Sequence, residues 1–284
     1  MQVLITGAGG QLGRDLVHAF ADHDVVAADR ARLDVAERDQ VLGVVTSLRP
    51  DVVVHAAALT AVDACETDPD RAWRVNALGS RHVADACARI GAHLCAISTD
   101  YVFDGRARVP YTEWDATGPL NVYGRSKLGA EREVLALAPG ASVVRTSWLC
   151  GAHGHNFVRT MVGLAGGTSG VVPVVDDQHG CPTFSVELAA MVRRLVVGRL
   201  PGLFHVTNAG ATTWFALARS VFALVGADAA RVVPITTAEL RPAPAAPRPA
   251  FGVLDNAALR LSGMGVLGDH HEPLERLVTE LIGR

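Results

Sequence analysis

The feature that most constrains the fold is a glycine-rich segment near the start of the chain, TGAGGQLG at residues 6–13. It follows the short apolar run QVLIT, and a helical pattern begins at Gln11. Gly7, Gly10 and Gly13 have the spacing G-x-x-G-x-x-G. In a strand–turn–helix unit such glycines permit a tight turn, close approach of a pyrophosphate, and close packing of the helix on the strand. The segment therefore predicts a dinucleotide site at a helix N-terminus.

Apolar runs alternate with helical patterns through the first half of the chain. The periodicity predicts strands and helices in turn: strands at 2–6, 24–29, 51–58, 93–98 and 141–147, and helices from Gln11, at 37–48, at about 68–90 and at about 119–137. Because the strands are apolar throughout, they indicate a parallel sheet that helices cover on both faces. The expected fold class is α/β, with a Rossmann-type doubly wound parallel sheet.

The pattern becomes less regular after Gly151. It predicts further elements, with helices at 156–165, 185–197, 213–225 and 272–282, and strands at 171–175, 203–207 and 231–235. A proline-rich loop, RPAPAAPRPAF, occupies residues 241–251. We expect residues 1–150 to form an NAD(P)-binding Rossmann domain, rejoined by segments around 176–210. Residues 151–284 are expected to form mainly a smaller C-terminal α/β domain that binds the substrate.

Composition excludes several classes of protein. The 284 residues carry a net charge of −3, and the basic residues form no stripe, so nucleic-acid binding has no electrostatic support. No apolar run reaches the ~18 residues of a membrane span. The sequence begins without a basic leader, so no signal peptide is expected. The five cysteines contain no C-x-x-C pair, which favours free thiols and a cytoplasmic location.

Two pairs of histidines were considered as metal ligands. His153 and His155 lie two residues apart, and His270 and His271 are adjacent. Neither pair has a third ligand nearby in the sequence at a useful spacing. We interpret both pairs as ordinary loop residues.

An acidic residue ends the second predicted strand. Asp29 lies 22 positions after Gly7, where a carboxylate can accept hydrogen bonds from the adenosine ribose hydroxyls and disfavours a 2′-phosphate. Arg30 follows it directly, and an arginine there can accommodate the phosphate. The choice between NADH and NADPH therefore stays open. Asp29 can also be interpreted as a simple strand-end cap.

The segment YGRSK, residues 123–127, holds the only lysine among 26 basic residues. Residues four apart share a helix face, so Tyr123 and Lys127 are expected to point the same way. A free tyrosine ionises near pH ~10, and a neighbouring ammonium lowers that value. Lysine is a compact point charge, whereas the guanidinium of arginine is a bulkier planar fork. The pair therefore predicts a general acid tuned by Lys127, and the alternative is a chance surface lysine.

A glycine loop followed by Tyr-x-x-x-Lys resembles the extended short-chain dehydrogenase/reductases. Further motifs resemble one family within them, the dTDP-4-dehydrorhamnose reductases. The motifs are VVHAAALTAVDACE (53–66), VNALGS (75–80), STDYVFDG (98–105), PLNVYGRSKLGAE (119–131), VVRTSWLCG (143–151), NF (156–157) and DDQHGCPT (176–183). The resemblance covers nearly the whole chain and is weakest after about residue 240.

The resemblance implies hydride transfer from NADPH or NADH to the 4-keto carbon of a dTDP-linked 4-keto-6-deoxyhexose, giving dTDP-L-rhamnose. It implies that Tyr123 protonates the 4-oxyanion, that Lys127 tunes Tyr123 and holds the nicotinamide ribose, and that Thr99 stabilises the developing charge. It also assigns cofactor contacts to the glycine loop, the second strand end and the third strand end: Gly7, Gly10, Gln11, Leu12, Gly13, Asp29, Arg30, Asp34, Val35, Ala56, Ala57, Ala58, Tyr123 and Lys127.

The same resemblance implies substrate contacts at Thr99, Asp100, Trp148, Asn156 and Arg248. Arg248 is the expected partner of the substrate diphosphate, because an acidic protein needs local cations there. A solvated loop arginine is the alternative.

Some members of the family dimerise through a magnesium ion. Asp15, Glu187 and Glu280 occupy the matching positions, although three carboxylates on helices can equally be a solvated surface. We expect a monomer or a homodimer.

The chain departs from the family in two places, which leaves the identity of the sugar open. Gly252 stands near the place where the family usually has a serine, and Leu149 and Cys150 replace the commoner Val-Tyr after the tryptophan. A dehydratase is disfavoured, because Tyr101 follows Thr99-Asp100 where that chemistry needs a glutamate. Two alternatives remain: a 4-ketoreductase for another dTDP-deoxyhexose, and a non-catalytic NAD(P)-binding regulatory subunit.

Overall fold

The computed structural model describes residues 1–167 and 170–283, and its largest element is a six-stranded parallel sheet. The strand order is β10-β5-β4-β3-β1-β2. The bounds are β1 (Gln2–Thr6), β2 (Asp24–Ala28), β3 (Val52–His55), β4 (His93–Thr99), β5 (Ser142–Thr146) and β10 (Gly202–His205). The order 2-1-3-4-5 is that of a doubly wound sheet, in which successive crossovers change direction between β1 and β3. The predicted α/β fold class is confirmed.

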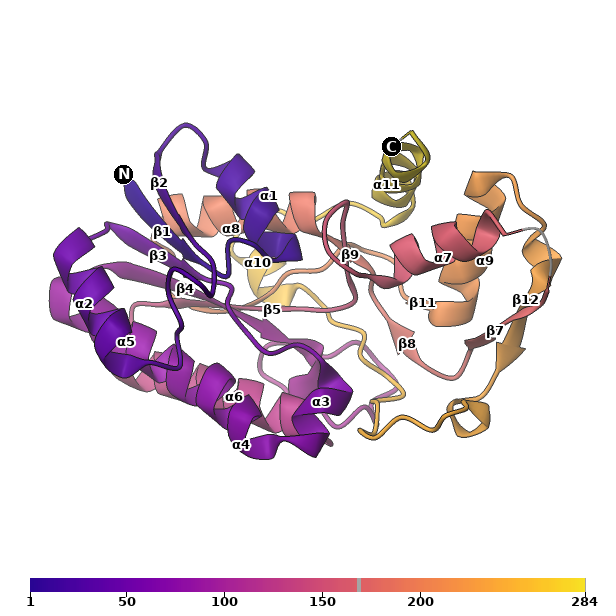
Figure 1. Ribbon diagram of the computed structural model, residues 1–284, viewed down its shortest axis with the longest axis horizontal. Coiled ribbons are helices and arrows are strands. Elements are labelled where there is room, and N and C mark those ends of the chain that lie inside the picture. Colours follow the sequence, from indigo (N-terminus) through magenta and orange to yellow (C-terminus); the bar gives the residue numbers. More distant parts are fainter. Residues whose placement is uncertain (168–169, 284) are drawn as a thin grey trace.

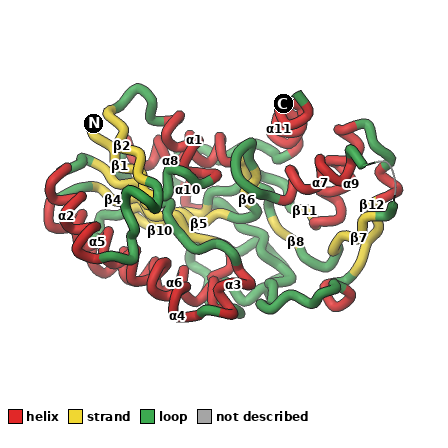
Figure 2. Tube along the Cα trace, in the orientation of Figure 1, coloured by secondary structure: helices red, strands yellow, loops and turns green. Residues whose placement is uncertain are grey.

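Helices cover both faces of this sheet (Figures 1 and 2). One face carries α1 (Gln11–Ala19), α8 (Ser185–Val197) and α10 (Ala257–Leu261), which bury Leu16, Leu188 and Leu259 in one core. The other carries α2 (Arg38–Leu48), α5 (Gly79–Ile90) and α6 (Val122–Leu137), which bury Val41, Val83 and Val134 in a second core. The apolar strands separate the two cores, as a buried parallel sheet requires.

The helix expected from about residue 119 begins at Val122. Asn121 caps it, because the side-chain oxygen accepts a hydrogen bond from the backbone N–H of Gly124 at 2.8 Å. The Asn121 side chain also donates to the carbonyl of Pro247 at 2.8 Å. This cap therefore ties the start of α6 to the proline-rich loop.

The single helix expected at 68–90 is divided into α4 (Pro69–Ala72), the π-helix η1 (Trp73–Leu78) and α5. The side chain of Asn76 in η1 accepts from the N–H of Leu59 at 2.8 Å and donates to the hydroxyl of Ser126 at 2.9 Å. Single π-turns are often found at functional sites. Here the π-turn places the buried side-chain amide of Asn76 between the segment after β3 and helix α6.

A smaller part of the chain has its own core, which lies to the right in Figure 1. It contains α7 (Phe157–Ala165), β7 (Val172–Val175), α9 (Trp214–Val225), β12 (Val232–Ile235) and α11 (His271–Ile282). β7 pairs with β12, while two further pairs of short strands join β6 (Leu149–Cys150) to β9 (Thr183–Phe184) and β8 (His179–Gly180) to β11 (Thr212–Thr213). The short strands were not predicted, since two residues give no periodicity.

The remaining short elements are α3 (Val62–Thr67), η2 (Asp100–Val102), η3 (Ala229–Arg231) and η4 (Thr237–Glu239). Strand β10 is part of the large sheet and helix α8 packs on that sheet, although both elements follow residue 150. The division into two functional domains stays a prediction. In residues 1–167 and 170–283, no helix has both the length and the apolar character needed to cross a bilayer.

Candidate active site

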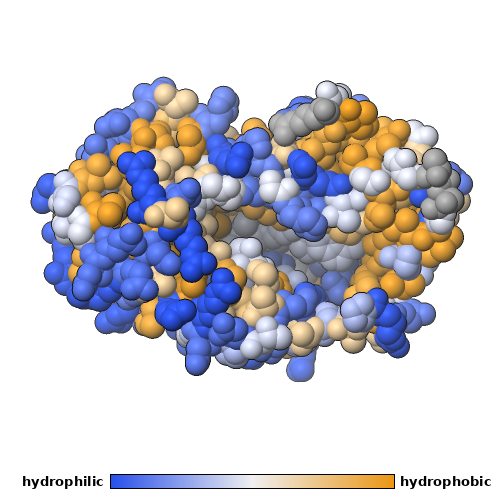
Figure 3. Space-filling view, viewed as in Figure 1, coloured by the Kyte–Doolittle hydropathy of each residue, from blue (hydrophilic) through white to orange (hydrophobic). Residues whose placement is uncertain are grey.

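A cleft of about 710 Å³ lies at the carboxyl ends of β1, β3 and β4 and extends to Trp148 and Trp214. The space-filling view shows the molecule hollowed between its two parts (Figure 3). The ends of β1 and β3 are the switch point of the sheet, which is where ligands bind in doubly wound folds. All predicted cofactor-binding residues line this cleft, as do Thr99, Asp100 and Trp148.

The glycine loop at the end of β1 is too crowded for side chains. Gly7 has a φ of +67°, and a Cβ there would lie 2.7 Å from the backbone nitrogen of Ala57. A Cβ on Gly13 would lie 2.2 Å from the carbonyl oxygen of Gly7. The loop therefore forms a backbone cradle at the N-terminus of α1, which is the arrangement that a pyrophosphate needs. On this observation the residues fit a dinucleotide.

Ala56, Ala57 and Ala58 follow β3 and form the opposite side of the cradle. The N–H of Ala57 donates to the hydroxyl of Thr6 at 3.3 Å, which holds the ends of β1 and β3 together. The backbone of this segment lies so close to Gly7 that a Cβ on residue 7 would meet the Cα of Ala57 at 2.8 Å. The segment thus exposes main chain to the cleft.

The end of β2 supplies a mixed set of charges. The Asp29 carboxylate accepts from the N–H of Arg32 at 3.0 Å. The exposed Arg30 side chain donates from Nε to the carboxylate of Asp34 at 3.2 Å. Asp29, Arg30, Asp34 and Val35 all line the cleft. Both an acceptor for ribose hydroxyls and a cation for a 2′-phosphate are therefore present at this end.

Tyr123 and Lys127 lie in the first turns of α6, and both are buried and line the cleft. The ammonium of Lys127 donates to the carbonyl oxygen of Ile97 on β4 at 2.7 Å. Burial lowers the pKa of Lys127 to about 8, against the opposing effect of the Glu131 carboxylate. The ammonium is thus held at the end of β4, beside the cleft.

Lys127 was expected to lower the pKa of Tyr123, but the net shift of that pKa is in the opposite direction. Burial raises the pKa of Tyr123 well above its ordinary value, and a hydrogen bond with Thr99 opposes this. The ammonium of Lys127, which is hydrogen-bonded to the carbonyl of Ile97, does not offset the effect of burial. The ring of Tyr101 also packs edge-on against that of Tyr123, with centroids 5.5 Å apart.

Thr99 and Asp100 end β4 beside the phenol. The Thr99 hydroxyl donates to Oδ1 of Asp100 at 3.0 Å and accepts from the N–H of Tyr101 at 3.3 Å. Asp100 is only 2% exposed, and its Oδ2 has no hydrogen-bond partner. Burial raises the pKa of Asp100 to about 7.

Two tryptophans form the far wall of the cleft. The indoles of Trp148 and Trp214 stack with centroids 3.5 Å apart and an interplanar angle of 8°. Trp148 has a φ of +43°, and its ring covers Gly180, where a Cβ would lie 2.3 Å from the indole. Trp214 was missed from the sequence. It begins a helix in the irregular second half, where no motif signalled a cleft residue.

Two predicted substrate contacts lie outside the cleft lining in the part of the chain that the structure describes. Asn156 caps α7, accepting from the N–H of Arg159 at 3.1 Å and donating to Gly151 at 2.7 Å and to Gln11 at 3.0 Å. Its hydrogen-bonding groups are thus occupied by the protein, which leaves its predicted substrate contact without support.

Arg248 is also engaged by the protein. It forms a two-pronged ion pair with Asp63 of α3, with both N–O distances 2.6 Å. The hydrogen bonds from Arg248 lower the pKa of Asp63 to about 2. Arg248 also contacts Tyr101, which lines the cleft. The arginine therefore lies one residue away from the cleft, and its predicted contact with diphosphate stays a prediction.

A buried ion pair behind Lys127 was also missed. Glu131 accepts from Arg145 at 2.8 and 2.7 Å and from the hydroxyl of Ser98 at 2.5 Å. Both charged side chains are about 5% exposed or less. Glu131 follows Lys127 by four residues, and this spacing was an available signal. The pair connects α6 to the ends of β4 and β5.

The predicted magnesium ligands do not gather. Among the described residues, Asp15, Glu187 and Glu280 are absent from the groups of three whose ligand atoms approach one another. Glu187 instead contacts Asn208 and Arg276. The three carboxylates therefore form no site within one chain, and the expected magnesium ion at a dimer interface is not supported.

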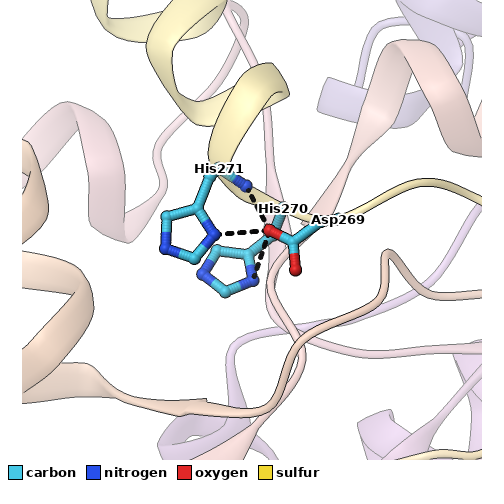
Figure 4. Close-up of side chains that lie close together, drawn as sticks. All are labelled: Asp269, His270 and His271. Atoms are coloured by element: carbon cyan, nitrogen blue, oxygen red, sulfur yellow. Dashed lines mark hydrogen bonds and ion pairs between the residues drawn. The ribbon is translucent and has the colours of Figure 1, made fainter.

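One group of potential ligands does occur, at Asp269, His270 and His271, with ligand atoms within 4.8 Å of one another. The expectation that His270 and His271 have no third ligand nearby is wrong. Figure 4 shows both imidazoles and the His271 backbone nitrogen converging on one oxygen of Asp269. The group is thus a hydrogen-bonded start to α11, and His270 also contacts the carbonyl of Ala209 at 3.2 Å.

Comparison with known proteins shows the relationship. The chain matches the family described as RmlD substrate binding domain over residues 1–282. A dTDP-4-dehydrorhamnose reductase of Streptomyces griseus is 44% identical over 99% of this chain and 94% of that protein. A protein of Streptomyces antibioticus named "Probable dTDP-4,6-dihydroxy-2-methyloxan-3-one 4-ketoreductase" is 42% identical over 99% of this chain and 96% of its own.

A solved structure gives the same result in three dimensions. The dTDP-4-dehydrorhamnose reductase of Bacillus anthracis, in complex with NADP, is 39% identical and has a TM-score of 0.94. The match covers 98% of this chain and 99% of that one. With the glycine cradle, Thr99, Tyr123 and Lys127 gathered in one cleft, this chain belongs to the dTDP-4-dehydrorhamnose reductase family.

Proposed function

We propose that the protein reduces the 4-keto group of dTDP-4-dehydrorhamnose to give dTDP-L-rhamnose, using NADPH or NADH. The observation that carries this proposal is the meeting of Thr99, Tyr123 and Lys127 in the same cleft as the glycine cradle. The relatives named as dTDP-4-dehydrorhamnose reductases support the substrate, and the NADP complex of the Bacillus anthracis protein supports a nicotinamide cofactor.

A nicotinamide cofactor, when bound, supplies the hydride. Tyr123 supplies the proton, which passes from the phenol to the oxygen at C4 as that oxygen gains charge. Burial raises the pKa of Tyr123, so the phenol is protonated at neutral pH, as a proton donor must be. A sugar alkoxide is a stronger base than a phenolate, and the proton therefore moves toward the substrate.

Lys127 and Thr99 stabilise charge at this point. Below pH about 8 the Lys127 side chain is positive, and it favours the phenolate left after proton transfer. The Thr99 hydroxyl lies beside the phenol and can donate a hydrogen bond to the oxygen that becomes negative. The residues after β1, β2 and β3, which line the rest of the cleft, would hold the cofactor.

We further propose that the part built on the large sheet holds the cofactor and the smaller part holds the nucleotide sugar. Trp148 and Asp100 contact the sugar, and Arg248 becomes available to the diphosphate through exchange of its partner Asp63. The substrate contact of Asn156 requires the amide to leave its place at α7, so we rank it last. The protein acts as a monomer or a homodimer. The five free thiols support the expected cytoplasmic location.

The test is consumption of NADPH and of NADH with dTDP-4-dehydrorhamnose, followed by determination of the product configuration at C4. Turnover to dTDP-L-rhamnose is expected. Cofactor binding without turnover on any dTDP-4-keto sugar would instead favour the non-catalytic regulatory subunit.

A second candidate is a 4-ketoreductase for another dTDP-deoxyhexose. The Streptomyces antibioticus relative, at 42% identity, favours it. Comparing kcat/KM for dTDP-4-dehydrorhamnose with that for ring-deoxygenated analogues separates the two functions. A higher kcat/KM for a deoxygenated sugar would select the second candidate.

A further inference from the structure

Asp100 is a buried carboxyl group with one oxygen that no group in the protein binds. Its Oδ1 accepts from the Thr99 hydroxyl at 3.0 Å, whereas Oδ2 is buried without a partner. Burying a polar atom without a hydrogen bond is costly, and for an ionised carboxylate the usual response is to take up a proton. The mechanism above gives this acid no role other than touching the sugar.

Gly252 lies against Oδ2 and offers it no hydrogen-bond donor. The N–H of Gly252 donates to the carbonyl of His179 at 2.7 Å, which holds the backbone of residue 252 against Asp100. A Cβ on residue 252 would lie 2.6 Å from Oδ2. A side chain there would therefore either displace the carboxyl group or, if it carried a hydroxyl, bind it.

The protonation state of Asp100 decides what Thr99 can do. The Thr99 hydroxyl has a single hydrogen. A carboxylate only accepts hydrogen bonds, so an ionised Asp100 takes that hydrogen for itself. A neutral carboxylic acid can instead donate to the Thr99 oxygen, which frees the Thr99 hydrogen for another acceptor in the cleft.

We propose that Asp100 is a positioning residue that acts in its neutral form, donating to Thr99 so that the Thr99 hydroxyl points at the oxygen being reduced. This inference rests on the proposed reduction of a keto sugar. It assigns Gly252 the role of keeping the acid neutral by leaving Oδ2 without a donor. The reaction then requires a proton on Asp100 in addition to the proton that Tyr123 gives to the substrate.

The surroundings of Asp100 agree with a neutral acid. The titratable groups that face it are Tyr101 on η2, Tyr123 on α6 and Cys181 between β8 and β9, and burial raises the pKa of each of these three. They are therefore uncharged at neutral pH.

The nearby cations are engaged elsewhere. Lys127 donates to Ile97, and Arg248 pairs with Asp63. Burial raises the pKa of Asp100 to about 7, although hydrogen bonds from the Thr99 hydroxyl and from the backbone N–H groups of Asp100 and Tyr101 act in the opposite direction. The fraction of enzyme with a correctly directed Thr99 therefore falls as pH rises past about 7.

The first experiment compares the pH dependence of kcat/KM for the unchanged protein and Asp100→Asn, since kcat/KM reports groups of the enzyme before the sugar binds. For the unchanged protein we expect a fall of about tenfold between the plateau and pH 8, the fraction left by a group of pKa 7. In Asp100→Asn the amide donates to Thr99 at every pH. The maximal kcat/KM of this variant is lower. The decrease in kcat/KM near pH 7 disappears, and the remaining decrease lies near pH 8, where Lys127 titrates.

The second experiment uses Gly252, which is not among the residues that line the cleft. Gly252→Ser adds a hydroxyl that can donate to Oδ2, so it stabilises the carboxylate and moves the fall to lower pH by about one unit. Gly252→Ala adds the same carbon without a donor and does not move the fall downward. Equal profiles for the two variants would overturn the proposal, as would a fall near pH 7 that persists in Asp100→Asn.

A third measurement is independent of turnover. Because the folded-state pKa of Asp100 is raised from 3.8 to about 7, this group favours folding below pH 3.8 and loses that contribution as pH rises through 7. The thermal midpoint of Asp100→Asn should therefore rise relative to the unchanged protein between pH 4 and pH 8. A constant difference would show that Asp100 is not a neutral acid. Absence of turnover with any dTDP-4-keto sugar would refute the proposed function, whereas turnover with a flat profile refutes only this inference.

Discussion

The glycine loop lines the cleft, whereas the proline-rich loop reaches it only through the contact of Arg248 with Tyr101, and the two loops are held in different ways. Around Gly7 and Gly13 the backbone leaves no room for a Cβ, and the contacts are between main-chain atoms. Around Arg248 the contacts are made by side chains: its guanidinium pairs with the Asp63 carboxylate and donates to the carbonyl of Ala246, and Asp63 is about half exposed. The fold itself fixes the main-chain cradle. In a side-chain ion pair, by contrast, the arginine can exchange its carboxylate partner for a ligand.

This difference suggests that the cofactor side is preorganised and that the substrate side is adaptable. Preorganised sites lose function steeply when a single atom is added. Exposed ion pairs contribute little to stability, and their partners can be replaced at small cost. The following predictions test the contrast, from the largest expected effect to the smallest.

Tyr123→Phe should lower kcat by about 1,000-fold, because it removes the proton donor while leaving the ring in place. Binding of NADPH, followed by fluorescence titration, should change little. Rates within a factor of about three of the unchanged protein would contradict the donor role.

Gly13→Ala should disrupt the cradle, because the added Cβ would lie 2.2 Å from the carbonyl oxygen of Gly7. Overpacking of this kind costs about 1–3 kcal/mol, which lowers the thermal midpoint by about 2–10 °C in a chain of this size. Stabilisation by added NADPH should also be lost. Gly43→Ala on α2 is the matched control, because a Cβ there meets nothing within 4 Å. Equal thermal midpoints for the two variants would show that the cradle is not preorganised.

Arg248→Ala should raise the KM for the nucleotide sugar by about tenfold, the loss expected for a hydrogen bond to a charged group. The kcat should change less, since Arg248 is remote from the hydride and proton transfers. Arg241→Ala, in the same loop and bonded to Ala238 and Leu240, is the control. A fall in kcat as large as that of Tyr123→Phe would remove the distinction between the two sides.

Asp63→Asn should have the smallest effect, a change of KM of about two- to fivefold, because a half-exposed ion pair is screened by solvent. The pKa of Asp63 is lowered to about 2, so the pair stays charged between pH 5 and 9. The effect of the substitution should therefore be independent of pH in that range. A pH-dependent effect would mean that Asp63 and not Asp100 controls the profile.

The fold and the cofactor side could be predicted from the sequence because their signals are local. The glycine spacing, the strand ends at Asp29 and at Ala56–Ala58, and the Tyr123–Lys127 spacing each lie within one strand–helix unit. Parallel strands then bring those ends to one edge of the sheet. For this reason every residue predicted to bind cofactor lines the cleft, although the individual roles stay predictions.

The substrate side could not be predicted in the same way, because its contacts join distant segments. Asp63 and Arg248 are 185 positions apart, and no periodicity relates them. Trp214 stacks on Trp148 from a separate helix. The side chain of Asn156 caps a helix and does not line the cleft. Which of these two roles it takes depends on the three-dimensional packing. The net shift of the Tyr123 pKa was misjudged because helix spacing says nothing about burial.

The hydrogen bond between Lys127 and Ile97 has a practical consequence. Residues 1–284 contain one side-chain amine, and it lies buried on the cleft floor with its pKa lowered to about 8. Incorporation of ¹⁵N-labelled lysine during expression would therefore give one side-chain NMR signal, at the position where chemistry is proposed. Its chemical shift would follow cofactor occupancy directly, without a mutation and without background from surface lysines.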